Sequence, residues 1–137
     1  FLESIEEKNG EAIYEYGKIL YKDDKDEAIK YLKMAIKHDC IKAMHKYGRI
    51  LFDDELKEES IEYIKKAADK GNSKALYLYY TLLEKGEVKH NDKNEAIKHL
   101  EKAANKGYTK AIYEFVYKLS KIEERIKKII KIKEWQR

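Results

Sequence analysis

The histidines and the single cysteine are the side chains most able to hold a metal or act as nucleophiles. His38, His45, His90 and His99 are never three or four residues apart, so no two of them are neighbours on one helix face. Cys40 has no second cysteine with which to form a disulfide, and we expect it to be an inert, partly buried thiol. The sequence therefore predicts no metal site and no cofactor.

Acidic clusters at 23–26, 53–55 and 91–95 are the next candidates for cation binding. None has the spacing of a calcium loop or its closing glutamate. Each precedes a predicted helix, where Asp and Asn oxygens accept unpaired backbone N–H groups and negative charge suits the helix dipole, so we interpret them as helix caps. The chain also lacks a glycine-rich phosphate loop, a G-x-S-x-G elbow and an H-E-x-x-H helix. These observations argue against an enzyme.

The composition is typical of one soluble helical domain. Of the 137 residues, 41% are charged and none is proline, and the net charge is +4. Without proline the commonest helix breaker is missing, which favours long helices. No apolar run approaches the roughly 20 residues that a membrane-spanning helix needs. The single cysteine and the lack of a visible signal or membrane segment slightly favour the cytoplasm, although the compartment stays open.

Two amphipathic blocks recur along the chain. The first begins at Ala12, Ala43, Ala75 and Ala111, at spacings of 31, 32 and 36 residues. The second follows the first three copies and places small residues seven positions apart, two turns along one helix face: Ala28 with Ala35, Ser60 with Ala67, and Ala96 with Ala103. His99 stands where the other second blocks have Tyr31 and Tyr63, which favours a packing role over a ligand role.

Short polar links join these blocks, so consecutive helices are expected to be antiparallel neighbours. Gly71 and Gly107 stand where a helix C-terminus favours a left-handed residue. The sequence therefore predicts an all-α fold in which helical hairpins stack as an α-solenoid. We expect this array to span residues 1–120, with a partial repeat at 1–8, repeats at 9–39, 40–71 and 72–107, and the first helix of a fourth at 108–120.

These residues resemble the Sel-one-like repeat family, a relative of the tetratricopeptide repeats. Tyr16-Gly17 and Tyr47-Gly48 resemble its Leu-Gly pair, whereas Tyr79-Tyr80 and Phe115-Val116 lack the glycine. The resemblance spans about residues 1–120 and implies a right-handed α-solenoid that acts as an adaptor in assembly, signalling, secretion quality control or microbe–host contact. The third repeat matches the family's loop and second half best, with Lys85-Gly86-Glu87-Val88, Asn91-Asp92, Ala96, Ala103, Ala104 and Gly107.

The two ends depart from the repeat pattern. Phe1 falls in mid-helix, so we expect residues 1–7 to be the second helix of an upstream repeat and the chain to be a fragment of a longer repeat protein; a short natural cap is the alternative. Residues 121–137 form a basic amphipathic helix with seven Lys or Arg against three Glu, a surplus equal to the whole net charge. We expect this helix to cap the stack, packing Ile122, Ile126 and Ile129 against Ile112, Phe115 and Leu119.

The first helices are expected to line the concave face of the solenoid with aromatic and basic rows. Positions two, six and nine residues after each repeat alanine point away from the stack, at about 100° per residue. Tyrosine and arginine are enriched in binding hot spots, although the tyrosines at the second position are equally suited to packing between adjacent first helices. The candidate partner-binding residues at these positions are Tyr14, Lys18, Tyr21, His45, Arg49, Phe52, Tyr77, Thr81, Tyr113 and Lys118.

The leading hypothesis is a non-catalytic protein-interaction scaffold that binds a peptide or partner helix with acidic and aromatic-seeking groups on this face. The alternative is a tether to an anionic surface, either nucleic acid or membrane, through the basic helix at 121–137. A surplus of +4 is small beside the roughly six to ten phosphate contacts of a strong nucleic-acid binder. The identity of the partner and the oligomeric state are left open.

Overall fold

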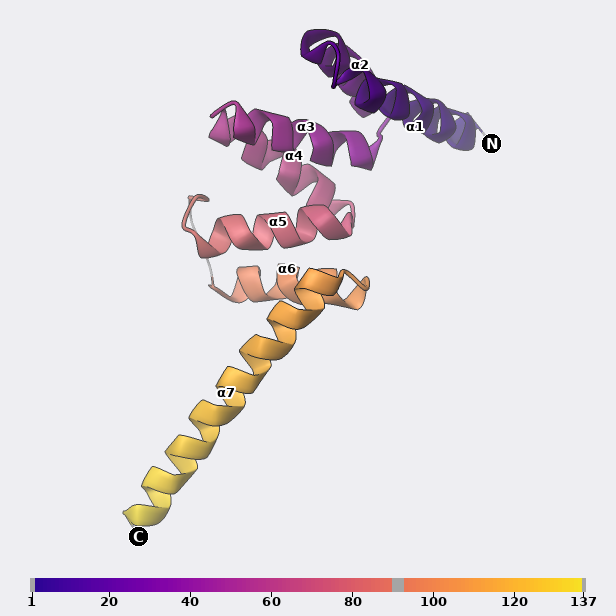
Figure 1. The fold of residues 1–137 in the computed structure, drawn as a ribbon. Coiled ribbons are helices and arrows are strands. Elements are labelled where there is room, and N and C mark those ends of the chain that lie inside the picture. The colour runs from indigo at the N-terminus through magenta and orange to yellow at the C-terminus, as the bar shows by residue number, and fades with distance from the viewer. Residues whose placement is uncertain (1, 90–92, 137) are drawn as a thin grey trace.

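The computed structural model describes residues 2–89 and 93–136, apart from the side chains of residues 2–7. Within these residues, seven helices form an all-α solenoid (Figure 1). α1 (Leu2–Leu20) pairs with α2 (Lys25–Lys37), α3 (Ile41–Asp53) with α4 (Lys57–Asp69), and α5 (Ser73–Glu84) with α6 (Lys93–Asn105). α2 contacts α3, α4 contacts α5, and α6 contacts α7 (Thr109–Trp135). The predicted solenoid of antiparallel hairpins is confirmed.

Small residues at the repeated positions of the two blocks allow neighbouring helices to approach closely. Ala12 is the exception among the repeat alanines: it is exposed, because nothing in the described chain covers that side of α1. The other small residues of both blocks are buried: Ala28, Ala35, Ala43, Ser60, Ala67, Ala75, Ala96, Ala103 and Ala111.

A residue with a left-handed backbone conformation follows the second helix of each hairpin. Gly71 and Gly107 have φ angles of +92° and +85°, as predicted, and Asp39 takes the same role after α2 with a φ of +62°. In the next residue the backbone N–H bonds back to the helix, as when Asn72 donates to the Ala67 carbonyl at 3.0 Å. This turn reverses the chain between one hairpin and the next.

The acidic clusters have different roles, and the capping prediction is confirmed at the first cluster and wrong at the second. Asp24 caps α2, because its side chain accepts the backbone N–H of Glu27 at 3.2 Å. The prediction is wrong for the cluster at 53–55, since α4 begins after Leu56 without a side-chain cap. There Asp54 instead accepts a 2.6 Å hydrogen bond from Lys25 of the preceding repeat. The third cluster is only partly described, since residues 91 and 92 lie outside the described residues.

An aromatic contact recurs inside each hairpin. The ring centroids of Tyr16 and Tyr31 lie 4.8 Å apart, and those of Tyr47 and Tyr63 lie 4.9 Å apart. In the third hairpin the equivalent contact, at 4.8 Å, joins Tyr79 to His99. His99 is buried and its Nδ1 lies 2.8 Å from the carbonyl oxygen of Glu95, so its predicted packing role is confirmed.

The first helix is continuous from Leu2 to Leu20, so the prediction that residues 1–7 form a separate helix is wrong. Gly10, the only helix breaker in this region, lies within α1. A Cβ at Gly10 would lie 3.0 Å from the Cβ of His38, so glycine here allows α1 to approach the α2–α3 turn. The expected packing of Phe1 and Ser4 concerns side chains outside the described residues.

The C-terminal residues do not fold back as a cap, and that prediction is also wrong. α7 runs without interruption from Thr109 to Trp135, and its outer half extends away from the stack (Figure 1). Every residue from 119 to 136 is exposed, including Ile122, Ile126 and Ile129. The physical reason is local, because no glycine or proline interrupts the helical pattern near Ser120.

Candidate partner-binding groove

A groove of about 500 Å³ crosses the face formed by the first helices. Its lining comes from α1, the turn that follows α1, and α3, with Lys74 from the start of α5. We call it the first-helix groove. Its lining residues are Tyr14, Lys18, Ile19, Tyr21, Lys22, His45, Lys46, Arg49 and Lys74.

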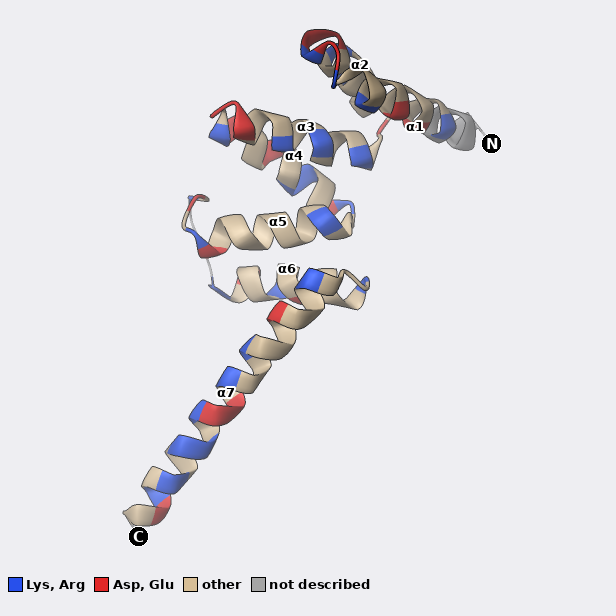
Figure 2. Cartoon of the chain, in the orientation of Figure 1, with Lys and Arg blue, Asp and Glu red and all other residues tan. Residues whose placement is uncertain are grey.

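The first-helix groove is lined by one sign of charge. Five of its side chains are lysine or arginine, and no carboxylate lines it. Figure 2 shows the basic residues along α3 and at the start of α5. Within the described residues, Lys22, Lys46, Arg49 and Lys74 form no ion pair. These four cations are therefore not neutralised by the protein itself.

Aromatic rings support the lysines of the groove. The Nζ of Lys46 lies 5.0 Å from the centroid of the Tyr21 ring, and the Nζ of Lys18 lies 5.7 Å from that of Tyr14. Lys18 also lies 3.8 Å from Glu15 on its own helix. A lysine held over a ring keeps its charge available to a ligand, whereas a lysine in a close ion pair does not.

Burial in the groove, assisted by the neighbouring positive charges, keeps the imidazole of His45 neutral. Burial, and after it the positive charges of Arg49, Lys74 and Lys46, together lower the pKa of its imidazole from 6.5 to about 4. His45 is consequently neutral at physiological pH and can offer one ring N–H donor and one nitrogen acceptor. In the same groove Tyr14 is nearly buried, and burial raises the pKa of its hydroxyl.

A smaller hollow of about 340 Å³ extends the groove toward the turn before α5. It shares Tyr14, Lys18, His45 and Lys74 with the first-helix groove, and it adds one carboxylate, Glu15, together with Lys42, Asn72 and Ser73. Lys42, at its edge, is paired with Glu11 at 3.0 Å. The two hollows together form a path along α1 and α3 for an elongated ligand.

The ten predicted binding residues do not form one continuous surface. The first-helix groove brings together Tyr14, Lys18, Tyr21, His45 and Arg49. Phe52 lies outside the groove and packs against the core, with its ring centroid 6.0 Å from the Nζ of Lys57.

The remaining four predicted residues lie around α5 and α7. Tyr77 contacts the rings of Tyr80 and Tyr108, at centroid distances of 5.9 and 5.4 Å. Thr81 donates to a carbonyl of its own helix, and Lys118 pairs with Glu84 at 3.3 Å. Tyr113 is 74% exposed on α7.

Four groove residues were missed by the sequence reasoning. Ile19 on α1, Lys22 in the turn after α1 and Lys46 on α3 each lie one position after a predicted residue, and Lys74 immediately precedes a repeat alanine. A search of positions next to the predicted rows would have found them. More than three positions per repeat on the first helices therefore face the groove.

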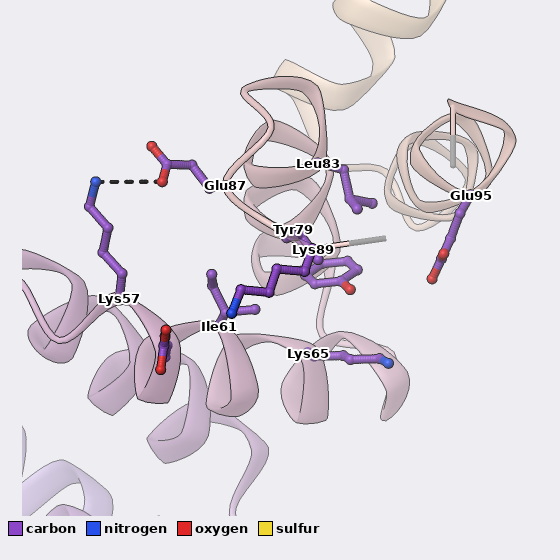
Figure 3. A pocket seen from close by; sticks show the side chains of 10 residues that line it. Lys57, Ile61, Lys65, Tyr79, Leu83, Glu87, Lys89 and Glu95 are labelled. Atoms are coloured by element: carbon purple, nitrogen blue, oxygen red, sulfur yellow. Dashed lines mark hydrogen bonds and ion pairs between the residues drawn. The ribbon is translucent and has the colours of Figure 1, made fainter. Parts of the chain in front are cut away.

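A third hollow, of about 660 Å³, lies between α4, α5 and the residues that follow α5, Glu87 to Lys89 (Figure 3). Its apolar lining comes from Ile61, Tyr79, Leu83 and Val88. The charged side chains are balanced, three lysines against three glutamates, and a 3.5 Å ion pair joins Lys57 to Glu87 across its edge. This hollow thus gives no preference for a ligand of either charge.

The other residues with chemical potential stay apart. Within the described part of the chain, no three His, Cys, Asp or Glu side chains gather as metal ligands. Cys40 is half-buried, and burial raises the pKa of its thiol. None of the helices formed by the described residues combines the length and apolarity needed to cross a bilayer.

Comparison with known families agrees with the repeat geometry. The family model described as Sel1 repeat matches residues 10–40, 41–72 and 73–108. The chain belongs to the Sel1-repeat family. Sel1-repeat proteins bind other proteins, and their fold is generally a protein-interaction scaffold that is typically non-catalytic.

Solved structures of Sel1-repeat proteins share this fold. The chain is 26% identical to a Sel1 repeat protein from Oxalobacter formigenes, with a TM-score of 0.69 over 82% of this chain and 93% of that one. It is 23% identical to c5321, a protective antigen of uropathogenic Escherichia coli strains that displays an SLR fold, with a TM-score of 0.68 over 82% of this chain and 26% of that one. No curated protein sequence matches the chain.

Proposed function

We propose that this Sel1-repeat chain is a non-catalytic scaffold that binds an acidic segment of a partner protein in the first-helix groove. The observation that carries the proposal is the lining of the groove, with five cationic side chains and no carboxylate. A ligand with several carboxylates gains above all from the four unpaired cations, Lys22, Lys46, Arg49 and Lys74, whereas a basic ligand is repelled.

The aromatic side chains of the groove favour a peptide over a simple anion. Tyr21 and Tyr14 offer ring faces beside Lys46 and Lys18, so a carboxylate and a neighbouring apolar or aromatic side chain can bind together. Neutral His45 adds a hydrogen-bonding group in the middle of the path. This combination supports recognition of a segment several residues long.

A binding titration tests the proposal directly. The probe is a fluorescein-labelled peptide of alternating Glu and Tyr residues, and fluorescence anisotropy gives its Kd for the full chain. Reversing two groove charges in Lys46→Glu/Arg49→Glu should weaken binding by about tenfold or more. The matched control is Lys98→Glu/Lys102→Glu, which reverses two exposed charges on α6, outside the groove. Equal affinities for the two double variants would contradict the proposal.

The anionic-surface tether is a weaker second candidate. The basic outer half of α7 is exposed, as a tether requires. However, its surplus of four charges falls short of the roughly six to ten phosphate contacts typical of a strong nucleic-acid binder. Binding of an oligonucleotide that is lost on deletion of residues 121–137 would support this candidate over the scaffold.

A further inference from the structure

One side of α7 carries an apolar stripe that nothing in the described chain covers. Its members recur at alternating intervals of four and three residues, which keeps them in line along the helix. The five apolar members are between 40% and 58% exposed. We call the set the α7 stripe: Ile112, Val116, Leu119, Glu123, Ile126 and Ile130. The stripe ends there, because Lys133 occupies the next position of the series.

The inner part of the α7 stripe corresponds to a face that is buried in the earlier hairpins. Its members follow the repeat alanine by one, five and eight residues. The equivalent residues are all buried: Met44, Gly48 and Leu51 on α3, and Leu76, Tyr80 and Leu83 on α5. Gly48 faces the second helix of its hairpin, since a Cβ there would lie 2.7 Å from Cγ1 of Ile64 on α4. Among the described residues α7 has no second helix to cover this face, because its outer half runs straight on (Figure 1).

The α7 stripe is complementary to itself when two copies of α7 run antiparallel. Its intervals of four, three, four, three and four residues read the same in both directions. The midpoint between Ile112 and Ile130 is residue 121, one position from the midpoint of Thr109–Trp135, so two such helices overlap along their whole length. Residues of the two copies then lie opposite each other as in an antiparallel coiled coil. The opposed residues are Ile112 with Ile130, Val116 with Ile126, and Leu119 with Glu123.

The charges of α7 favour the antiparallel pairing over a parallel one. A parallel pair places Glu123 against Glu123 of the second copy. The antiparallel pair places it against Leu119 and leaves it paired with Lys127 of its own helix at 3.3 Å. Arg125 and Lys128 lie on the other side of α7 from the stripe, at about 100° per residue, so they stay in solvent. The antiparallel arrangement also keeps the two basic outer halves apart, because each lies beside the inner half of the other helix.

We propose that a second copy of this chain covers the α7 stripe, and that the two α7 helices pair antiparallel in a symmetric dimer. Each outer half then fills the place of the second helix that its partner's α7 lacks. A membrane surface is a poorer occupant, because it would draw the charge of Glu123 into the apolar phase at the middle of the stripe. Below the Kd of the dimer the stripe is exposed, as in the single chain. This interface is separate from the first-helix groove, which lies on α1, α3 and the start of α5.

Sedimentation velocity of the full chain at about 1 to 200 µM tests for a reversible dimer. Ile126→Lys should weaken dimerisation by about tenfold or more, because it places two charges against apolar side chains in each dimer. The matched control is Ile132→Lys, the same change at an exposed position on the other side of α7, which should leave the Kd unchanged. Glu123→Leu should tighten the dimer by about tenfold, because it removes the one charge in the stripe.

Two complementary variants test the antiparallel register itself. Val116→Glu should weaken self-association as Ile126→Lys does, because each variant alone places a charge against an apolar residue. In an equimolar mixture the two introduced charges face each other across an antiparallel pair, so the mixture should dimerise again. In a parallel pair the two positions lie ten residues apart along the helices, and the mixture should stay monomeric.

Several results would overturn the proposal. A chain that is monomeric at every concentration would do so, as would dimers that survive Ile126→Lys or a mixture that is not rescued. A monomeric chain that binds phosphatidylserine–phosphatidylcholine vesicles, with binding lost in Ile126→Lys, would assign the stripe to a membrane instead. Lys46→Glu/Arg49→Glu should leave the Kd of the dimer unchanged, which separates this interface from the first-helix groove. Loss of the dimer in that double variant would place the contact at the groove.

Discussion

The hydroxyl of Ser60 on α4 donates a 2.7 Å hydrogen bond to the backbone carbonyl of Gly48 on α3. Both residues are buried, and a Cβ on Gly48 would lie 2.7 Å from Cγ1 of Ile64. The bond satisfies a polar group in the core, and the missing side chain allows the two helices to touch. The central hairpin therefore depends on a glycine and a small hydroxyl residue at the closest approach of its helices.

Replacing this glycine should destabilise the chain. Gly48→Ala forces Ile64 or a helix axis to move, and we expect the free energy of unfolding to fall by about 1–2 kcal/mol despite the better helix propensity of alanine. Urea denaturation followed by circular dichroism measures this change. Gly17→Ala is the milder comparison, because a Cβ at Gly17 would lie 3.2 Å from its nearest neighbour, the Cβ of Tyr31. A more stable Gly48→Ala variant would refute the close-approach argument.

The assignment of buried and exposed faces on α4 predicts different stability effects for substitutions at Ala67 and Lys65. Ala67 is fully buried, so Ala67→Lys should cost about 3 kcal/mol or more through overpacking and an unpaired buried charge. Lys65 is exposed two positions earlier, and Lys65→Ala should change stability by less than about 0.5 kcal/mol. Thermal or urea unfolding of the two variants provides the check. Similar losses in both would mean that the helix faces are wrongly assigned.

The imidazole of His45 should make stability depend on pH. Its pKa falls from 6.5 to about 4 on folding, mainly through burial. Between these values the unfolded chain binds a proton that the folded chain does not, so the free energy of unfolding decreases as the pH falls through this window. We expect His45→Gln to lessen the loss between pH 7 and pH 4.5 by up to about 2 kcal/mol. If the free energy of unfolding of the unmodified chain and of His45→Gln changed equally with pH, the predicted pKa shift of His45 would be contradicted.

Removing the outer half of α7 should leave the repeats intact. No side chain from 121 to 136 is buried, so deletion of residues 121–137 should change the stability of the α1–α6 stack by less than about 0.5 kcal/mol. Solubility should rise, since the deletion also removes exposed isoleucines. Urea unfolding and the concentration at saturation measure both effects. A large loss of stability would instead indicate that the segment packs on the stack in solution.

The repeat architecture could be predicted because its determinants are local. Helical hairpins follow from three local features: the regular spacing of the alanines, the short links, and the positive φ angles of Gly71 and Gly107 at helix ends. The packing role of His99 followed from its alignment with two tyrosines. These features depend only on helical periodicity and turn chemistry within one repeat.

The ends and the groove depend on more than local pattern. The spacing of Ile122, Ile126 and Ile129 is the same for a folded-back cap and for an uninterrupted helix, and only the absence of a breaker near Ser120 distinguishes them. Lys74 and Lys22 enter the groove because successive hairpins place α1, α3 and α5 side by side. Sequence periodicity gives the face of each helix but not the offset between neighbouring hairpins.

The central claim, that the first-helix groove binds an acidic segment, is tested most directly by nuclear magnetic resonance. The experiment titrates the Glu–Tyr peptide into the ¹⁵N-labelled full chain and follows the backbone amide and His45 imidazole resonances. We predict saturable shifts at Tyr14, Tyr21, His45 and Arg49 and at the start of α5, which Lys46→Glu/Arg49→Glu abolishes. Shifts confined to α7 or to the hollow between α4 and the α5–α6 loop, with the groove resonances unchanged, would contradict the account.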